Sequence, residues 1–301
     1  MRSHIWALAN ITSLCSCLLF ALGMSAQDRS TAALENSGFT ITTFSVPNAG
    51  TAPRLGTIPY AINNSGLITG YFTDKKAVHH GFLRASNGNI TEFNAPGATT
   101  TTPDEGTYAL AIGPNGAITG SYQDSTGVYH CFVRSNGGKY TDYNAPDAGT
   151  AAGQGTGGCD GINASGAITG NYVDSNFAYH GFVGESDGTI TEFDAPDAGG
   201  GAGQGTLPYG ISASGTIAGE YWDANSDVHG FLRTADGTLT EFDVPGAGGT
   251  YGYAINTAGD ITGNSWIAGQ GASGMVRATN GKFLSFKAPG RHMYNRSGQP
   301  S

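Results

Sequence analysis

Short stretches rich in apolar and aromatic residues recur along the chain, and polar turn residues separate them. In the first complete set, residues 57–62, 67–72, 79–84 and 89–94 each have the length and composition of a β-strand. The turns between them contain Asn, Ser and Gly, which tolerate the backbone angles of tight turns. Pro96 ends the last stretch, because proline cannot donate a hydrogen bond to a neighbouring strand. The pattern therefore predicts four short antiparallel strands.

The four-strand pattern is one unit of an internal repeat. "AINNSGLITG" at 61–70 returns at 111–120, 161–170, 210–219 and 254–263, and His80, His130 and His180 stand 50 residues apart. Four strands at this period are typical of a β-propeller blade, in which each sheet buries its faces against its neighbours. We therefore expect an all-β fold, a β-propeller most simply built of five blades of four antiparallel strands. Six blades, a β-solenoid and an open stack of sheets remain alternatives.

One part of the repeat occurs once more than the rest. The segment "ITEFNAPGA" at 90–98, which contains the fourth strand, has three close copies later in the chain. Two weaker copies stand at 41–49 and 283–290. In a closed propeller, an initial fourth-strand segment can complete the last blade, but here the last unit has its own. The sequence leaves open which copy is surplus.

These repeated motifs resemble a known family. The unit A-I-N-x-x-G-x-I-x-G followed by H-G-F is similar to the HAF-type extracellular repeat of bacterial secreted proteins, over residues 39–290. Gly81, Gly181, Gly230 and Cys131 stand where the name-giving pattern has alanine. The resemblance implies an exported, propeller-like repeat protein. It implies no reaction and supplies no catalytic residues.

The start of the chain predicts export. Arg2 precedes an apolar run at 5–22, and "GMSAQ" then offers small residues for cleavage after Ala26. This pattern is typical of a secretory signal peptide, here residues 1–26, with a retained membrane anchor as the alternative. We expect a linker at 27–38, the propeller domain at 39–290 and a C-terminal tail at 291–301. The mature protein would then be secreted or periplasmic, without a membrane span.

Composition agrees with this picture and excludes one class of partner. Charged residues make up only 12% of the 301 residues, and 49 are glycine. Such a mixture favours short strands and turns over long helices. The net charge of −9 and the absence of a basic cluster argue against a nucleic-acid partner, whose phosphates would be repelled.

An aspartate followed six positions later by a histidine recurs in four units. Because catalysis normally needs one specific environment, four equivalent pairs indicate a structural role, with the carboxylate accepting hydrogen bonds from the imidazole or from turn N–H groups. The alternative is repeated sites for a polymeric ligand, with the aromatic residue before each aspartate as a stacking surface. The pairs are Asp74/His80, Asp124/His130, Asp174/His180 and Asp223/His229.

Few other residues suggest chemistry. The histidines and aspartates are spread over four units, so we expect no metal site and no cofactor. Cys131 and Cys159 remain after signal cleavage. In an exported protein they can form one disulfide, and two buried free thiols are the alternative.

Positions that do not repeat are better candidates for function. Asp160 starts the first strand of its unit, where the other units have Tyr60, Leu110, Tyr209 and Tyr253. First strands should lie nearest the propeller axis, where tyrosine rings can face sugar rings and a carboxylate can orient them. The sequence therefore predicts a ligand site formed by Tyr60, Asp160, Tyr209 and Tyr253. The alternative is that Asp160 only caps a strand end.

Two functions fit these expectations. The first is a secreted binding protein that recognises extracellular glycans or cell-envelope components. The second is a secreted carbohydrate-active enzyme, a glycoside hydrolase or polysaccharide lyase, acting at the axial face. Hydrolysis would need a second carboxylate, for which Asp104 and Glu105 are candidates. The sequence names no catalytic residue.

Overall fold

The computed structural model describes residues 41–287, and every regular element in that range is a β-strand. The predicted signal peptide (1–26), linker (27–38) and C-terminal tail (291–301) lie outside the described residues. Within 41–287 no helix has the length and apolar character needed to cross a bilayer.

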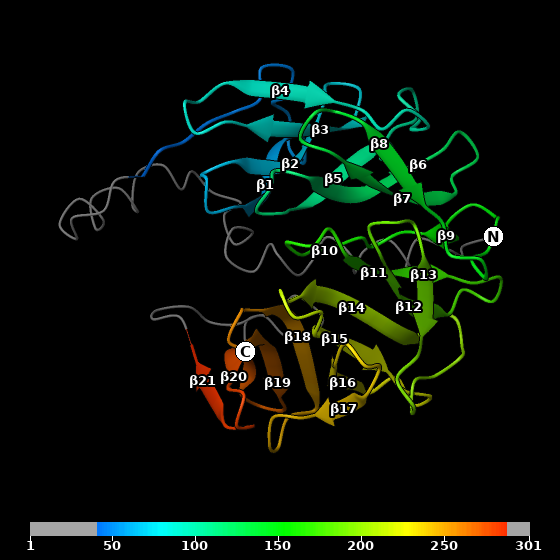
Figure 1. Cartoon of the computed structure of the whole chain (residues 1–301), viewed down its shortest axis with the longest axis vertical. Helices are drawn as coiled ribbons and strands as arrows, with labels where there is room; N and C mark the ends of the chain where they lie inside the picture. Colours follow the sequence, from blue (N-terminus) through cyan, green and yellow to red (C-terminus); the bar gives the residue numbers. More distant parts are fainter. Residues whose placement is uncertain (1–40, 288–301) are drawn as a thin grey trace.

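Five antiparallel units follow one another along the chain, and parallel bridges join the middle three into one 13-stranded sheet (Figure 1). We refer to each unit as a sheet. The first contains β1 (Gly56–Ile62), β2 (Ile68–Thr73), β3 (His79–Arg84) and β4 (Ile90–Phe93). The second contains β5 (Thr107–Ile112), β6 (Ile118–Gln123), β7 (Tyr129–Arg134) and β8 (Tyr140–Tyr143). The fourth contains β14 (Gly205–Ile211), β15 (Ile217–Trp222), β16 (Val228–Arg233) and β17 (Leu239–Phe242). The fifth contains β18 (Gly249–Ile255), β19 (Ile261–Ile267), β20 (Gly271–Arg277) and β21 (Phe283–Phe286).

The third sheet differs from the others at its first strand. Two short strands, β9 (Gly155–Thr156) and β10 (Gly161–Ile162), share the place that one strand fills elsewhere, and both pair with β11 (Ile168–Val173). β12 (Tyr179–Gly184) and β13 (Ile190–Phe193) complete the sheet. A side chain at Gly158, between β9 and β10, would place its Cβ 2.0 Å from Oδ1 of Asn171. The strand therefore breaks where glycine is required.

The sheets stand side by side around an arc, as blades do in a propeller. In Figure 1 the first strands β1, β5, β10, β14 and β18 lie toward the middle, and the fourth strands lie at the periphery. Single parallel bridges join successive sheets at Tyr129–Gly155 and Tyr179–Gly205. Among the described residues no strand pairing joins the first sheet to the fifth. The expectation of an all-β, propeller-like fold is confirmed, whereas closure into a five-bladed ring is not seen in residues 41–287.

The hydrophobic core lies between the sheets rather than within one of them. Phe132 of the second sheet packs with Phe93 and Leu83 of the first, and Phe231 of the fourth sheet packs with Phe193 of the third. β6 and β11 are buried along their whole length, because both of their faces contact a neighbouring sheet. This face-to-face burial explains why a single unit cannot stand alone.

Glycine in the H-G-F motif makes room for an aromatic residue on the fourth strand. A Cβ at Gly230 would lie 2.3 Å from the ring of Phe242, its partner across β16 and β17. Gly81 faces Phe93 in the same way, with 2.4 Å. Alanine at these positions would displace the ring, so glycine there has a steric reason.

The surplus fourth-strand copy is the segment 41–49, which packs on the first sheet. Phe44 lies under the guanidinium of Arg84 at 4.9 Å, and Val46 donates its backbone N–H to Thr57 at 2.8 Å. The end of β4 docks on the second sheet in the same manner, with Arg134 over Phe93 at 4.9 Å. The fifth sheet keeps its own fourth strand, β21, paired with β20. The segment 41–49 therefore takes the place that a preceding blade would fill.

Candidate functional site

The four repeated aspartates hold the turn between the second and third strands. In the second unit, Oδ1 of Asp124 accepts N–H groups from Thr126 at 2.8 Å and from Val128 at 3.1 Å. Its Oδ2 lies 3.2 Å from Nε2 of His130. The other three aspartates accept backbone N–H groups at the same two positions. The hydrogen bonds to the turn are therefore the main contacts of each carboxylate, and the contact with the histidine is secondary.

Each repeated histidine is fixed by a ring and by a polar partner. His130 stacks on Tyr122 with 4.9 Å between ring centroids, and its Nδ1 bonds Oδ1 of Asn144 at 2.9 Å. The equivalent aromatic residues are all buried and stack in the same way; they are Phe72, Tyr122, Tyr172 and Tyr221. These rings are therefore part of the packing and are not free platforms for a ligand.

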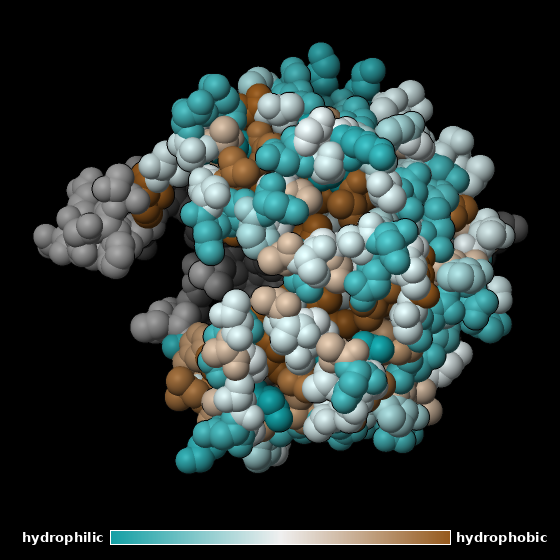
Figure 2. All heavy atoms as spheres, viewed as in Figure 1, coloured by the Kyte–Doolittle hydropathy of each residue, from teal (hydrophilic) through white to brown (hydrophobic). Residues whose placement is uncertain are grey.

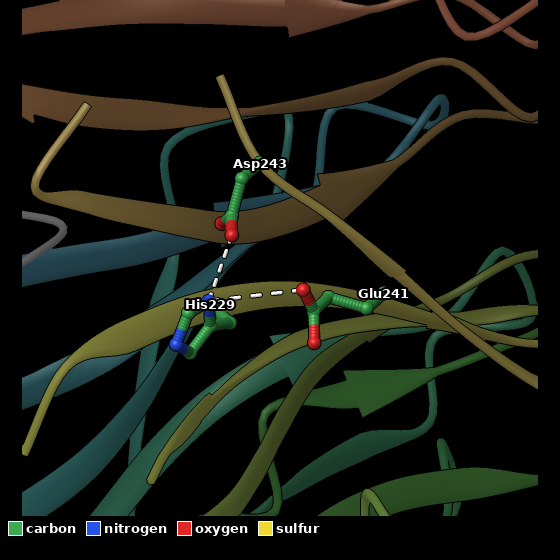
Figure 3. A group of neighbouring side chains, drawn as sticks. All are labelled: His229, Glu241 and Asp243. Carbon is green, nitrogen blue, oxygen red and sulfur yellow. Dashed lines mark hydrogen bonds and ion pairs between the residues drawn. The ribbon is translucent and has the colours of Figure 1, made fainter. Parts of the chain in front are cut away.

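The fourth unit places two carboxylates around its histidine (Figure 3). Nδ1 of His229 lies 2.7 Å from Asp243 and 3.9 Å from Glu241. Desolvation lowers the pKa of His229, but the hydrogen bond and the charge of Asp243 outweigh it and leave the pKa above its ordinary value. These three residues offer ligand atoms within 4.8 Å of one another. Both carboxylates are well exposed and already bonded, Glu241 to the hydroxyl of Tyr221, so the group is explained without an ion.

The predicted row of first-strand residues occupies a recurring irregularity of the sheets. The pairing of the first and second strands shifts register at four equivalent points, and the shifted residues are Tyr60, Leu110, Tyr209 and Tyr253. Such bulges re-aim a side chain relative to the strand. Asp160 lies at the matching point of the third sheet, in the break between β9 and β10.

Three members of the row lie next to one another. The rings of Tyr209 and Tyr253 meet edge to face, with centroids 5.5 Å apart. Asp160 is also a charged neighbour of Tyr209, and a Cβ on the adjoining Gly161 would lie 2.7 Å from the Tyr209 carbonyl oxygen.

The other two members have contacts of their own. Tyr60 contacts Tyr71 of its own sheet, at 6.0 Å between centroids. Leu110 is buried. Of the four residues predicted to form the ligand site, Asp160, Tyr209 and Tyr253 are thus linked to one another by described contacts.

Sequence reasoning missed two side chains at this place. Glu220 on β15 is only 2% exposed, and its Oε1 accepts bonds from the Tyr209 hydroxyl at 3.4 Å and from Trp222 Nε1 at 3.3 Å. Its Oε2 is buried without a hydrogen-bond partner. We call the five residues Asp160, Tyr209, Glu220, Trp222 and Tyr253 the inner carboxyl cluster.

Burial dominates the electrostatics of the inner carboxyl cluster. It raises the pKa of Asp160 to about 7, and no charged neighbour contributes to that shift. Burial also raises the pKa of Glu220 to about 8, against the hydrogen bonds from Trp222 and Tyr209. The pKa of Tyr209 lies well above its ordinary value, first through burial and then through Glu220. No lysine or arginine among the described residues pairs with either carboxyl group.

The cluster is reachable at its edge. Asp160, Tyr209, Trp222 and Tyr253 are each partly exposed, whereas Glu220 lies behind them. The residues come from three successive sheets, at the first-strand side that faces the middle of the arc in Figure 1.

The signal that points to Glu220 was present in the sequence. Its equivalents on the other second strands are Tyr71, Ser121, Asn171 and Asn264, so it is the one acidic residue at that position. The same criterion of non-repetition singled out Asp160. The contact of Glu220 with Tyr209 depends on the register in which β14 pairs with β15, and the sequence alone does not give that register.

The other carboxylates considered from sequence lie elsewhere. Asp104 is a charged neighbour of His79, and its backbone carbonyl accepts the Tyr108 hydroxyl at 2.8 Å. Here Tyr71, His79 and Tyr108 pack together, with centroids 4.8 to 5.3 Å apart. Desolvation lowers the pKa of His79 to about 4. Glu220, rather than Asp104 or Glu105, is therefore the carboxyl group that accompanies Asp160 around Tyr209.

A disulfide supports the loop that carries Asp160. Cys131 on β7 and Cys159 are bonded, with 5.9 Å between their Cα atoms, and both residues are fully buried. The bond joins the second sheet to the break between β9 and β10. It therefore fixes the residue directly before Asp160.

No protein-family model matches the sequence, and a search of curated proteins found no match. Solved structures with a similar fold exist. TolB from Acinetobacter baumannii is 10% identical, over 72% of this chain and 52% of that chain, with a TM-score of 0.49. This chain thus spans about half the length of TolB.

Two further structures are similar at a lower score. Aleuria aurantia lectin in complex with alpha-methyl-L-fucoside is 13% identical, over 77% of this chain and 79% of the lectin, with a TM-score of 0.42. A GH43 glycoside hydrolase with an engineered active site is 9% identical, over 80% and 54%, with a TM-score of 0.35. At these identities and scores the likenesses assign neither a ligand nor an activity.

Proposed function

We propose that this protein binds carbohydrate at the inner carboxyl cluster. The supporting observation is that two carboxyl groups and three partly exposed rings converge from three sheets at a point where the repeat units differ. Aromatic faces with a few polar groups are the usual composition of a sugar site. The repeated histidine sites do not offer accessible aromatic faces and polar groups, because their rings are buried and their polar atoms are bonded to each other.

The proposal includes the setting expected from the sequence. We take the protein to be an exported member of the HAF-type repeat proteins, with its five sheets as the blades of a propeller. Extracellular or cell-envelope glycans would then be its partners. The fit of the repeat motifs and of the predicted signal peptide supports this part of the proposal.

A glycan-binding screen of the chain without residues 1–26 tests the function. We expect at least one glycan to bind, and Tyr209→Ala to weaken that binding about tenfold or more, which corresponds to about 1.4 kcal/mol. Asp160→Asn, which keeps the shape of the side chain, should weaken it as well. Asp236→Asn, on the exposed hairpin after β16, is the control. Binding that survives both cluster variants would place the site elsewhere and overturn the proposal.

A second candidate function is glycoside hydrolysis at the same place. The observation that favours it is the raised pKa of Asp160, about 7, beside Glu220, whose pKa is about 8. Glycoside hydrolases need one carboxylic acid that is still protonated near neutral pH. Product analysis on each bound polysaccharide distinguishes the two functions. Shortened products that disappear with Glu220→Gln would support hydrolysis. Intact polysaccharide would mean that the protein binds it without cleaving it.

A further inference from the structure

The inner carboxyl cluster contains two acidic groups without a positive partner. Oε2 of Glu220 is buried and receives no hydrogen bond. No described residue donates a hydrogen bond to the carboxylate of Asp160, although protein surrounds it closely enough to raise its pKa. A buried carboxyl group without a donor or a counter-charge is costly, so proteins seldom keep one without a use. A ligand that offers these groups a hydrogen-bond donor or a positive charge would therefore be stabilised here.

The surroundings of the two groups define the kind of cation. Tyr209, Trp222 and Tyr253 place aromatic rings around the carboxyl groups, and such rings attract a positively charged ligand. Trp222 directs its Nε1–H at Glu220. A metal ion fits poorly beside that group, because an N–H offers no lone pair to a metal. An organic ammonium group can both donate hydrogen bonds to the carboxylates and lie against the rings.

We propose that the inner carboxyl cluster recognises a cationic amine, and that the ligand is an amino sugar carrying a free ammonium group. This proposal rests on the carbohydrate-binding function proposed above and names its ligand class. Glu220 receives the ammonium group, Asp160 provides the second negative charge at the partly exposed edge, and Tyr209 with Tyr253 supports the sugar ring. The net charge of −9 for the chain also favours a cationic ligand.

The different solvent exposure of the cluster residues supports this assignment. Glu220 is enclosed at 2% exposure, whereas Asp160, Tyr209 and Tyr253 remain partly exposed. Only a small group could be admitted beside Glu220, so the ammonium group would enter there and the bulk of the sugar would stay at the edge. An ammonium group would stabilise the charged form of both carboxyl groups, whose pKa values burial raises to about 7 and about 8. A neutral hydroxyl in the same position would leave them protonated and would gain less.

Three oligosaccharides of the same β-1,4 backbone test the inference, because they differ at carbon 2. Glucosamine, N-acetylglucosamine and glucose tetramers carry an ammonium, an acetamide and a hydroxyl group there. We expect the glucosamine tetramer to bind at least tenfold more tightly than the other two at pH 7, close to the pKa values of about 7 and about 8 of the two carboxyl groups, measured by calorimetry. Glu220→Gln should remove most of this preference, and Asp236→Asn, which loses one charge on the same sheet, should keep it.

The outcomes separate the inference from the proposed function. Equal binding of the three tetramers, or a preference that survives both Glu220→Gln and Asp160→Asn, would overturn the amine assignment and leave carbohydrate binding in place. Binding of a neutral glycan from the screen, with none of the three tetramers bound, would also overturn it. Failure of every glycan to bind would instead remove the proposed function.

Discussion

At the scale of single residues, the repeated aspartates are the main source of order in the turns between second and third strands. Each accepts two backbone N–H groups, so the aspartate stabilises the turn even without its histidine. The histidine adds a stacked ring and one further bond. The structural interpretation of the pairs is therefore consistent with the contacts, and the emphasis shifts from the histidine to the aspartate.

Replacing His130 by alanine should cost about 1 kcal/mol of unfolding free energy, the value of one ordinary hydrogen bond and its packing. The cost is small because Asp124 keeps its bonds to Thr126 and Val128. Asp124→Ala should cost more, since the turn then loses those bonds. Urea unfolding of both variants measures the difference. A larger loss of unfolding free energy for His130→Ala than for Asp124→Ala would contradict the view that the aspartate contributes more.

The Asp124 carboxyl group should also make the protein sensitive to acid. Desolvation raises its pKa, but the hydrogen bonds from Thr126, Val128 and His130 outweigh it and lower the pKa to about 2. The stabilisation is present above the unfolded value near 4 and is lost as the pH falls toward 2. Asp124→Asn should therefore lose less stability than the parent protein between pH 5 and pH 2.

Urea unfolding at several pH values between 2 and 5 tests this difference. Asp197→Asn is the matched control, because Asp197 is exposed and receives no hydrogen bond among the described residues. Identical pH dependence of Asp124→Asn and the parent would show that the turn bonds do not shift the titration.

At the scale of strands and sheets, the disulfide is the one covalent cross-link between two units within residues 41–287. It closes a loop between positions 28 residues apart, for which loop entropy predicts roughly 3–4 kcal/mol of stabilisation. We expect a reducing agent to lower the denaturant midpoint of the parent protein. A Cys131→Ser, Cys159→Ser double variant should start near the reduced value and should not respond. A midpoint that does not move on confirmed reduction of the bond would contradict this estimate.

The strands were largely predictable because their ends are marked by turn residues. The third strand of the first unit was placed at 79–84 and is found at His79–Arg84. The first strand of the third unit could not be foreseen as broken, because Gly157 and Gly158 read equally well as strand residues next to a turn. The collision of any side chain at Gly158 with Asn171 depends on the neighbouring strand.

The candidate site was predictable only in part for a related reason. Asp160 was found because it interrupts a repeated position within one strand. Glu220 approaches Tyr209 through the pairing of β14 with β15, and Asp160 does so through contact between two sheets. The spacing of residues along the chain predicts neither of these two contacts. For Tyr60 the structure gives a contact with Tyr71 of its own sheet, which the spacing of the repeat does not reveal either.

At the scale of the whole molecule, the two ends of the arc differ from its middle. Large exposed apolar side chains occur at both ends, Ile41 and Ile62 by the first sheet and Leu284 and Phe286 on β21. Figure 2 shows hydrophobic side chains at the edge where β21 lies. The residues equivalent to Phe286 in earlier units are covered by the following sheet, as Phe93 is by Arg134. The first sheet is covered instead by the segment 41–49.

Loosening that segment should cause the molecules to associate end to end. A Phe44→Ser, Val46→Ser double variant removes the ring under Arg84 and the buried valine, and so frees the first sheet to contact β21 of another copy. Sedimentation velocity should then show dimers and longer species that grow with protein concentration. Adding Leu284→Ser and Phe286→Ser should reverse this. A double variant that stays monomeric would mean that the two ends are not complementary.

The bond between Cys131 and Cys159 has a consequence for when the protein works. Cys159 directly precedes Asp160, so opening the bond releases the residue that carries one of the two charges of the inner carboxyl cluster. In a reducing compartment the two thiols would stay apart, and the site would be incomplete there. Under the export and ligand binding proposed above, the newly made chain would not bind its ligand inside the cell that makes it. The site would be complete only after the chain reaches oxidising surroundings.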